Sequence, residues 1–332
     1  MTMNLRSVVI SVLLLGFAIV PILAHSMEAS YFMDIAIRMM ILGLAAVSLD
    51  FLLGFGGLVS FGHAAFLGIG AYAVGILAYH GIDNGFIHLG VTVGASALIA
   101  LAIGFVCLRT TGLHFLMITL GFGQMFYFLG TSLDEYGGED GMTVYGNSQF
   151  PVVDLGDTLT LYYVVFLVLV ATLFFLNRAV NSRFGMVLRG AKVNERRVLS
   201  IGIPVFRYRL TAFVMSGVIC GIAGFLLANQ NLFVSPAIVH WTRSSELLIM
   251  VILGGIGTLF GPLLGAVVLL FLEAELSRYT QHWQLPLGVL LLLIVLYTRR
   301  GIFGALFVSR QQSTDKKSKW SLGQMRRRNS HA

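Results

Sequence analysis

The sequence predicts an all-α, polytopic membrane bundle of about ten transmembrane or re-entrant helices. Of its 332 residues, 57% are hydrophobic and only 11% are charged, whereas a soluble domain carries roughly 25% charged residues. The mean hydropathy is +0.86, and 38 glycines accompany just 6 prolines. Such a composition is typical of helices that pack closely in an apolar environment. It excludes a soluble enzyme and a disordered or collagen-like chain.

Apolar runs follow one another along most of the chain, which we interpret as one membrane domain over residues 1–308. One crossing needs roughly 20 residues. The runs lie at 7–24, 34–54, 58–79, 86–107, 113–130, 160–177, 208–229, 245–258, 261–276 and 284–298. The two short runs at 245–258 and 261–276 are alternatively half-helices that enter the membrane and turn back, as transport sites often require.

The first run resembles a signal peptide, because Arg6 precedes it and the small residues Ala24 and Ser26 follow it. We nevertheless expect the run to remain in the protein. A first crossing that begins in the cytoplasm is needed if the later segments are to lie on the sides that their charges favour.

The positive charge of the chain is concentrated in two segments. Eight basic residues and one acidic residue lie between Arg178 and Arg209, and seven basic residues and one acidic residue lie in the tail at 309–332. Lys and Arg are retained on the cytoplasmic side of a membrane. We therefore expect a cytoplasmic loop at 178–207 and a cytoplasmic tail that is disordered and binds either anionic lipid or a partner protein. The net charge of +7 thus reflects topology, and no nucleic-acid partner is predicted.

The loop at 131–158 has the opposite character. It contains six acidic residues and no Lys or Arg, so we expect it on the side opposite the cytoplasm. Ten alternating crossings that start with a cytoplasmic N-terminus give the same result, and they also return the C-terminus to the cytoplasm.

No catalytic or metal site is predicted. The eight histidines are scattered without HExxH spacing, and Cys107 and Cys220 have no CxxC or CxxH pattern around them. None of the four lysines follows a glycine, so the GxxxxGK[ST] loop that cradles phosphates is absent. If ATP powers this protein, another chain must hydrolyse it.

A few charged residues lie within or beside the apolar runs. Asp50 lies deep in its run, so it needs a buried partner or an aqueous cavity, unless its carboxylate reaches back to the membrane surface. Asp34 and Arg38 are four residues apart and can pair on one helix face. Arg243 and Glu246, three apart, form either a surface pair or part of an external gate.

Glycine clusters at two places, and the segment GGLVSFGH at 56–63 is the sharpest local feature. Its glycines permit bending and close helix approach, and Ser60 and His63 add hydrogen-bonding groups. A broken or re-entrant segment and a simple helix-packing notch both remain open. The second cluster, at 254–265, shares with the first a Gly-Gly pair, a hydroxyl residue and a Phe-Gly.

The basic loop includes an amphipathic stretch at 185–201, which we expect to be helical. Its apolar residues are available for insertion into a partner; they are Met186, Val187, Leu188, Val198 and Leu199. Anionic lipid headgroups and a soluble subunit are equally compatible with this pattern.

Five stretches resemble the permease subunits of high-affinity branched-chain amino acid ABC importers, and more narrowly the longer of the two permeases. They include LDFLLGFGGLVSFGHAAFLGIG, the acidic GGEDGM, RGAKVNERRVLSIGIP and LGGIGTLFGPLLGAVVL. The stretches occupy 49–77, 109–129, 137–142, 189–226 and 240–269. The resemblance extends over most of residues 35–305 and leaves out the basic tail.

The resemblance implies a fold of the ABC importer permease type in a bacterial inner membrane. A periplasmic binding protein would deliver the substrate, and this chain would form a heterodimeric pore with a second permease. Two cytoplasmic ATPases would bind ATP and Mg²⁺, so this chain itself would hold no cofactor. The missing phosphate loop agrees with that division of labour.

The resemblance also assigns roles to particular residues. Part of the basic loop would be the coupling helix that docks on an ATPase, and its residues are Arg189, Gly190, Ala191, Lys192, Asn194, Glu195 and Arg196. The two glycine clusters would line the translocation pathway, with Gly56, Gly57, Ser60, Phe61, Gly62, His63, Gly254, Gly255, Thr258 and Gly261.

Two alternatives remain at this point. The related permeases for urea and short amides share the same overall pattern, so the residues do not separate those substrates from amino acids. An ion-coupled secondary transporter predicts carboxylates at mid-depth in the membrane. Only Asp50 and Glu246 approach that position.

Overall fold

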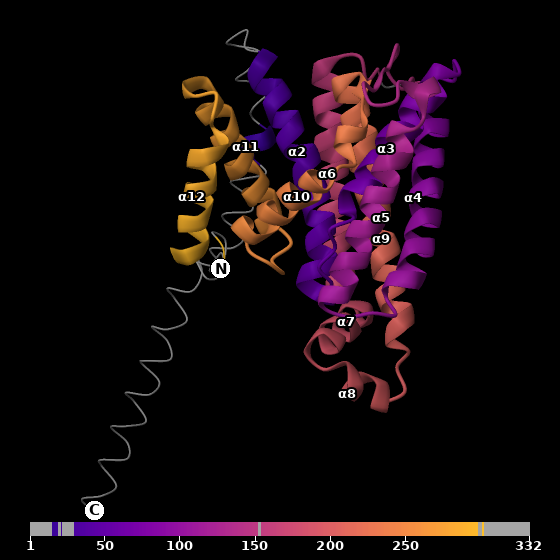
Figure 1. Ribbon diagram of the computed structural model, residues 1–332, viewed down its shortest axis with the longest axis vertical. Helices are drawn as coiled ribbons and strands as arrows, with labels where there is room; N and C mark the ends of the chain where they lie inside the picture. The colour runs from indigo at the N-terminus through magenta and orange to yellow at the C-terminus, as the bar shows by residue number, and fades with distance from the viewer. Residues whose placement is uncertain (1–14, 19–20, 22–29, 152–153, 298–300, 302–332) are drawn as a thin grey trace, which may run out of the picture.

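The computed structural model describes residues 15–18, 21, 30–151, 154–297 and 301, which form a helical bundle with very little sheet (Figure 1). The long helices are α2 (Ser30–Asp50), α3 (His63–Tyr79), α4 (Gly85–Cys107), α5 (Leu113–Thr131), α6 (Thr158–Val180), α9 (Val205–Asn231), α10 (Trp241–Gly254), α11 (Gly261–Tyr279) and α12 (Gln284–Tyr297). The short elements are η1 (Phe51–Phe55), η2 (Asp134–Tyr136), β1 (Met142–Thr143), α7 (Arg183–Val193), α8 (Glu195–Ser200), β2 (Phe233–Val234) and η3 (Pro236–Ile238). The predicted all-α membrane fold is confirmed.

Six segments of the described chain are long and apolar enough to cross a membrane, so the predicted count of ten crossings is not confirmed. They are Tyr31–Phe55, Gly85–Cys107, Leu113–Thr131, Thr158–Val180, Val205–Asn231 and Pro236–Gly254. Two shorter apolar helices lie at His63–Tyr79 and Gln284–Ile294. Most of the first run and the whole tail at 309–332 lie outside the described residues, as do the predictions made for them.

Helices α2 and α9 form the centre of the bundle. The side chains of α2 from Met39 onward are almost all buried, as is most of α9. Around this centre, α3, α4, α5 and α6 lie on one side and α11 and α12 on the other (Figure 1). Lipid gives no hydrophobic drive for helices to associate, so close backbone packing must hold them. Gly70 of α3 and Gly221 of α9 provide such a contact, since a Cβ on Gly70 would collide with the Gly221 carbonyl.

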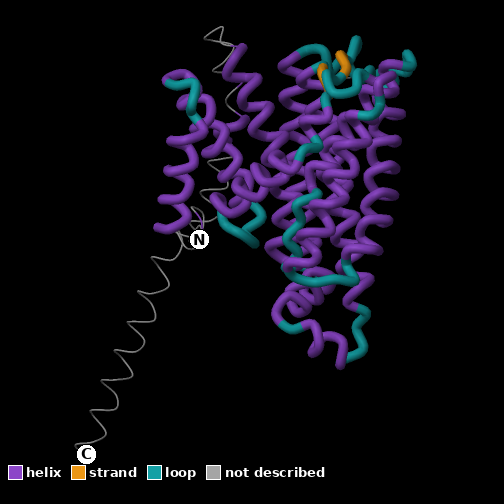
Figure 2. The backbone as a smooth tube through the Cα atoms, in the orientation of Figure 1, coloured by secondary structure: helices purple, strands orange, loops and turns teal. Residues whose placement is uncertain are grey.

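The acidic loop and the basic loop lie at opposite ends of the bundle. Strands β1 and β2 pair antiparallel at one end, among the loops drawn at the top of Figure 2. Helices α7 and α8 project from the other end (Figure 1). The two charged loops thus lie at opposite ends, and their placement on the two sides of a membrane stays a prediction. Asp157 caps α6 at the acidic end by accepting hydrogen bonds from Thr160, which hold the pKa of its carboxyl below the usual range.

Two helix breaks interrupt the bundle, at the two glycine clusters. After η1, which is a π-helical turn, residues 57–62 are not helical, so the predicted crossing at 58–79 becomes a helix only at His63. The second break covers 255–260, where Gly255, Gly257 and Leu259 all have positive φ. Non-helical backbone at membrane depth is tolerated where protein buries it or where it lines a water-filled cavity. The broken-segment interpretation is thus confirmed.

Candidate functional site: two helix breaks and the α7–α8 loop

Asp50, the last residue of α2, joins the two breaks. Its side chain is fully buried. One carboxylate oxygen accepts a hydrogen bond from the backbone N–H of Gly257 at 2.7 Å, and the other accepts one from Leu259 at 3.3 Å. Such charge-assisted bonds satisfy both a buried charge and backbone donors that the break leaves free. The predicted buried partner of Asp50 is confirmed, and the alternative of a carboxylate reaching the membrane surface is wrong.

The backbones of the two breaks touch directly beside this carboxylate. A Cβ placed on Gly54 would lie 2.5 Å from the Cα of Gly257 and 2.5 Å from an oxygen of Asp50. No side chain fits there. The glycines at this point are therefore required by contact between segments about 200 residues apart in the chain, in addition to the bending that glycine permits.

Lys192 connects α7 to the same place. Its ammonium Nζ donates a hydrogen bond to the carbonyl oxygen of Gly54 at 2.6 Å. Its methylene groups cover Gly57, where a Cβ would lie 2.9 Å from the Lys192 Cγ. A cation at the carbonyl end of a helix is favourable because the helix dipole is negative there. Lys192 also attracts the carboxylate of Asp50 electrostatically.

The first break is held by hydroxyl side chains from neighbouring helices. The backbone N–H of Phe61 donates to the hydroxyl of Thr119 in α5 at 3.2 Å. The N–H of Ala64 donates to the hydroxyl of Ser244 in α10 at 3.0 Å. Isolated hydroxyl residues in apolar runs were the available signal for these anchors, but their partners depend on the three-dimensional packing.

His63 begins α3 in the centre of the bundle. Its Nε2 lies 2.7 Å from the hydroxyl oxygen of Ser216, and that hydroxyl donates its proton to the Ser48 carbonyl at 2.5 Å. Because a serine hydroxyl has one proton, the Nε2 of His63 must be the donor to Ser216. His63 is thus assigned as the neutral Nε2–H tautomer, which ties α3 to α9 and α2.

The basic loop is helical, as predicted for 185–201, but it is folded as two short helices. α7 ends at Val193 and Asn194 caps α8, accepting a hydrogen bond from the N–H of Arg197 at 3.2 Å. The predicted apolar set divides accordingly. Leu188 and Val198 are buried within the chain, Val187 is half-buried, and Met186 and Leu199 are exposed.

Most of the predicted coupling residues contact the chain itself. Arg189 donates to the carbonyls of Gly185 and Val180, and Glu195 forms a 2.7 Å ion pair with Arg209 of α9. Ala191 is buried, Gly190 packs near Val198, and Asn194 is the α8 cap. Arg196 is exposed.

The exposed apolar side chains of the loop include two residues outside the predicted apolar set, and one of them, Val193, lies within the 190–196 stretch that the resemblance assigns to the coupling helix. Val193 is 87% exposed and Ile201 is 71% exposed, beside the exposed Met186 and Leu199. We define the α7–α8 tip as Met186, Val193, Arg196, Leu199 and Ile201. Sequence reasoning did not include Val193 and Ile201 among the apolar residues available for insertion into a partner.

The chain as a whole matches a protein family. Residues 31–298 match the model of the branched-chain amino acid transport system permease component. The chain belongs to this permease family. It is therefore a multi-pass membrane protein and a transport component.

Individual relatives agree with this assignment. The permease is 30% identical to the high-affinity branched-chain amino acid permease LivM of Salmonella typhimurium, over 81% of this chain and 69% of that protein. It is 29% identical to LivM of Escherichia coli over the same shares, and 25% identical to LivH of Escherichia coli over 79% and 90%. The resemblance to the longer permease is confirmed. No solved structure matches.

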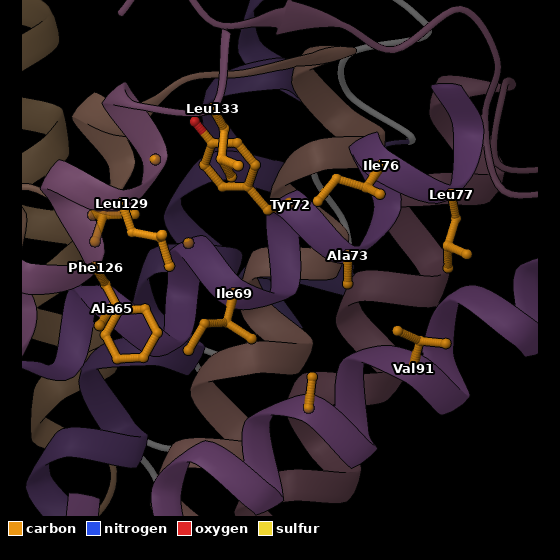
Figure 3. A pocket seen from close by; sticks show the side chains of 14 residues that line it. Ala65, Ile69, Tyr72, Ala73, Ile76, Leu77, Val91, Phe126, Leu129 and Leu133 are labelled. Atoms are coloured by element: carbon orange, nitrogen blue, oxygen red, sulfur yellow. The ribbon is translucent and has the colours of Figure 1, made fainter. Parts of the chain in front are cut away.

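The permease also has an apolar pocket between α3, α4 and α5, with a volume of about 330 Å³ (Figure 3). Ile69, Tyr72 and Ile76 of α3 line it together with Val91 of α4 and Phe126 of α5. None of the ten residues predicted for the translocation pathway lines this pocket. Their assignment to the pathway therefore stays a prediction, while their contacts show that they form and hold the two breaks.

Two predicted ion pairs of the permease have different outcomes. Arg243 and Glu246 lie 2.7 Å apart, as predicted. Arg38 pairs instead with Glu273 of α11 at 3.7 Å, so the predicted Asp34–Arg38 pair is wrong. The reason is that α11 packs against α2 and brings a carboxylate to Arg38. The described part of the permease contains no group of three or more His, Cys, Asp or Glu residues suited to a metal ion.

Proposed function

We propose that this chain is the pore-forming permease subunit of an ATP-driven importer for branched-chain or related hydrophobic amino acids. The observation that carries the proposal is the α7–α8 tip, which projects beyond the bundle and exposes apolar side chains beside Arg196 (Figure 1). Exposed apolar groups on a loop outside the membrane mark a binding surface for another protein. The absence of a phosphate-binding loop in the sequence makes an ATPase the expected partner.

The proposed assembly contains four kinds of subunit. A second permease completes a heterodimeric pore, since the relatives include both LivM and LivH permease proteins. Two ATPases bind at the cytoplasmic end and hold ATP and Mg²⁺. A periplasmic binding protein delivers substrate to the end with the acidic loop. The chain lies in the bacterial inner membrane with both termini in the cytoplasm, where the positive-inside rule puts the basic loop.

Transport in this assembly is alternating access. Closure of the ATPases on ATP moves the α7–α8 tip, and the helices repack between outward-open and inward-open states. Breaks at 57–62 and 255–260 supply the bending points, because non-helical segments absorb backbone rotation more readily than helices do. The binding protein sets most of the specificity, so the pore makes weak contacts with the substrate.

The carboxylates give no support to the ion-coupled alternative. A secondary transporter needs carboxylates that can bind and release an ion at mid-depth. Asp50 is engaged by two backbone donors, and Glu246 is paired with Arg243 near the start of α10. The family relatives, moreover, are named for branched-chain amino acids.

The decisive experiment is to co-express the chain with the transport genes that neighbour it, purify the complex through this chain and measure uptake in vesicles. We expect two ATPase subunits and a second permease to co-purify, and uptake of radiolabelled leucine to require ATP and the binding protein. Uptake that persists on a proton gradient without ATP would contradict the proposal. Uptake of urea in place of leucine would favour the related urea and amide importers.

A further inference from the structure

Three polar side chains of the α7–α8 loop tie it to the rest of the chain, and one of them reaches a helix break. Arg189 binds the Val180 carbonyl at the end of α6, and Glu195 binds Arg209 in α9. Both partners lie close to the loop in the sequence. Lys192 instead binds Gly54, which is 138 residues away. Movement of α7 therefore has a direct path to the first break through Lys192.

We propose that Lys192 is the positioning residue that transmits movement of the α7–α8 loop to the two helix breaks, by holding or releasing the Gly54 carbonyl. The inference rests on the proposed function for the source of that movement. In this proposal Lys192 acts through its contact with Gly54 inside the chain, in place of direct contact with an ATPase.

The Gly54 carbonyl depends on Lys192 because of the π-helical turn. The N–H of Leu58, which would bond Gly54 in a continuing α-helix, bonds the carbonyl of Leu52 instead, at 3.3 Å. The N–H of Gly57 bonds Leu53 at 3.1 Å. The Lys192 ammonium thus donates a hydrogen bond to a carbonyl oxygen that the end of the helix leaves without a backbone donor.

The contact is suited to being broken and remade. The Lys192 side chain is long and Lys192 is an exposed residue, so water can replace the Gly54 carbonyl as its partner at little net cost. Asp50 differs, because its carboxylate is buried and binds two backbone donors in the second break. When Lys192 leaves, the Gly54–Gly257 contact and the Asp50 bonds are expected to keep the two breaks together, so both move as one unit relative to α7.

Lys192→Met tests the proposal in the complete transporter, reconstituted in liposomes with its binding protein. Methionine keeps an apolar side chain over Gly57 and removes the donor. We expect the complex to assemble and hydrolyse ATP within about twofold of the wild-type rate, while leucine transported per ATP falls at least about tenfold. A protein that is merely less stable would lose both rates together.

Two further variants separate the hydrogen bond from the charge. Lys192→Arg retains a cationic donor and is expected to restore part of the transport per ATP, and Lys192→Gln, with a shorter neutral donor, is expected to restore less. Should the Lys192→Met chain itself fail to accumulate in the membrane, the difference between the Arg and Gln variants gives the same comparison.

Three outcomes overturn the inference. An unchanged transport per ATP in Lys192→Met would show that the contact transmits nothing. An equal loss of ATP hydrolysis and transport would show a structural role, and loss of ATPase subunits from the complex would make Lys192 a docking residue. A wild-type chain that binds no ATPase would overturn the proposed function itself, which distinguishes the two failures.

Discussion

At the scale of single residues, Gly54 carries the closest contact between the breaks. Gly54→Ala would force its new methyl group against Gly257 and Asp50, both at 2.5 Å. Overpacking of this kind costs about 1–3 kcal/mol, so we expect a lower melting temperature in detergent and impaired transport. The matched control is Gly121→Ala in α5, where nothing lies within 4 Å of the added Cβ. Equal melting temperatures for the two variants would contradict the close approach of Gly54 to Gly257 and Asp50.

Asp50 itself offers a second test at this scale. Asp50→Leu removes both acceptors and leaves the buried N–H groups of Gly257 and Leu259 unpaired, each at a cost of about 1–3 kcal/mol. We expect a larger loss of thermal stability than in Asp50→Asn, which retains one side-chain acceptor. Melting curves of the purified chain in detergent measure both. If the asparagine variant were the less stable of the two, Asp50 would not stabilise the protein through its hydrogen bonds to the backbone.

Residue chemistry was predictable from the sequence, whereas partners were not. The burial of a carboxylate in an apolar run follows from its position, so a buried partner for Asp50 was expected. Its partner is 207 residues away, and no local pattern indicates that distance. The same holds for Lys192 and Gly54, since an exposed lysine on an amphipathic loop looks like part of an outer surface.

At the scale of elements, a substitution in the α7–α8 tip tests whether this exposed surface binds the ATPase. Val193→Asp adds a charge at a side chain that is 87% exposed, so it should leave the fold intact and weaken docking. We expect ATPase association to fall at least about tenfold, equivalent to about 1.4 kcal/mol. Co-purification with the ATPase subunits measures this.

The control for this variant is Tyr145→Asp, at a side chain that is 92% exposed in the acidic loop at the other end of the bundle. It introduces the same charge away from the tip and should leave ATPase association unchanged. If Val193→Asp had no effect either, the tip would not be the docking surface.

Helix boundaries were the least predictable feature at this scale. The segment at 58–62 contains Leu58, Val59 and Phe61, so its hydropathy continues that of α3 and gave no sign of a break. The helix begins only at His63. Thr119 accepts a hydrogen bond from the N–H of Phe61 before it, and Ser244 accepts one from the N–H of Ala64 in its first turn. Hydropathy measures transfer into lipid and does not report which neighbours will supply hydrogen bonds.

At the scale of the whole molecule, the arrangement of charge was predictable because it depends on sums over long segments. The acidic and basic loops lie at opposite ends of the bundle, as the charge bias indicates. The meeting of the two glycine clusters was not predictable, because it depends on how α2, α10 and α11 pack. Counting the crossings predicts on which side of the membrane each loop lies, but it does not predict which helices pack against one another.

The orientation of the molecule gives the last prediction. The native cysteines, Cys107 and Cys220, are fully buried, so a single added cysteine should dominate labelling by a membrane-impermeant maleimide. In right-side-out vesicles we expect Tyr145→Cys to react and Val193→Cys to remain unlabelled, and in inverted vesicles we expect the reverse. Because both side chains are almost fully exposed, burial cannot explain a difference between them. Reaction of both from the same side would mean that the two loops do not lie across a membrane, and would contradict the topology on which ATPase docking at the α7–α8 tip depends.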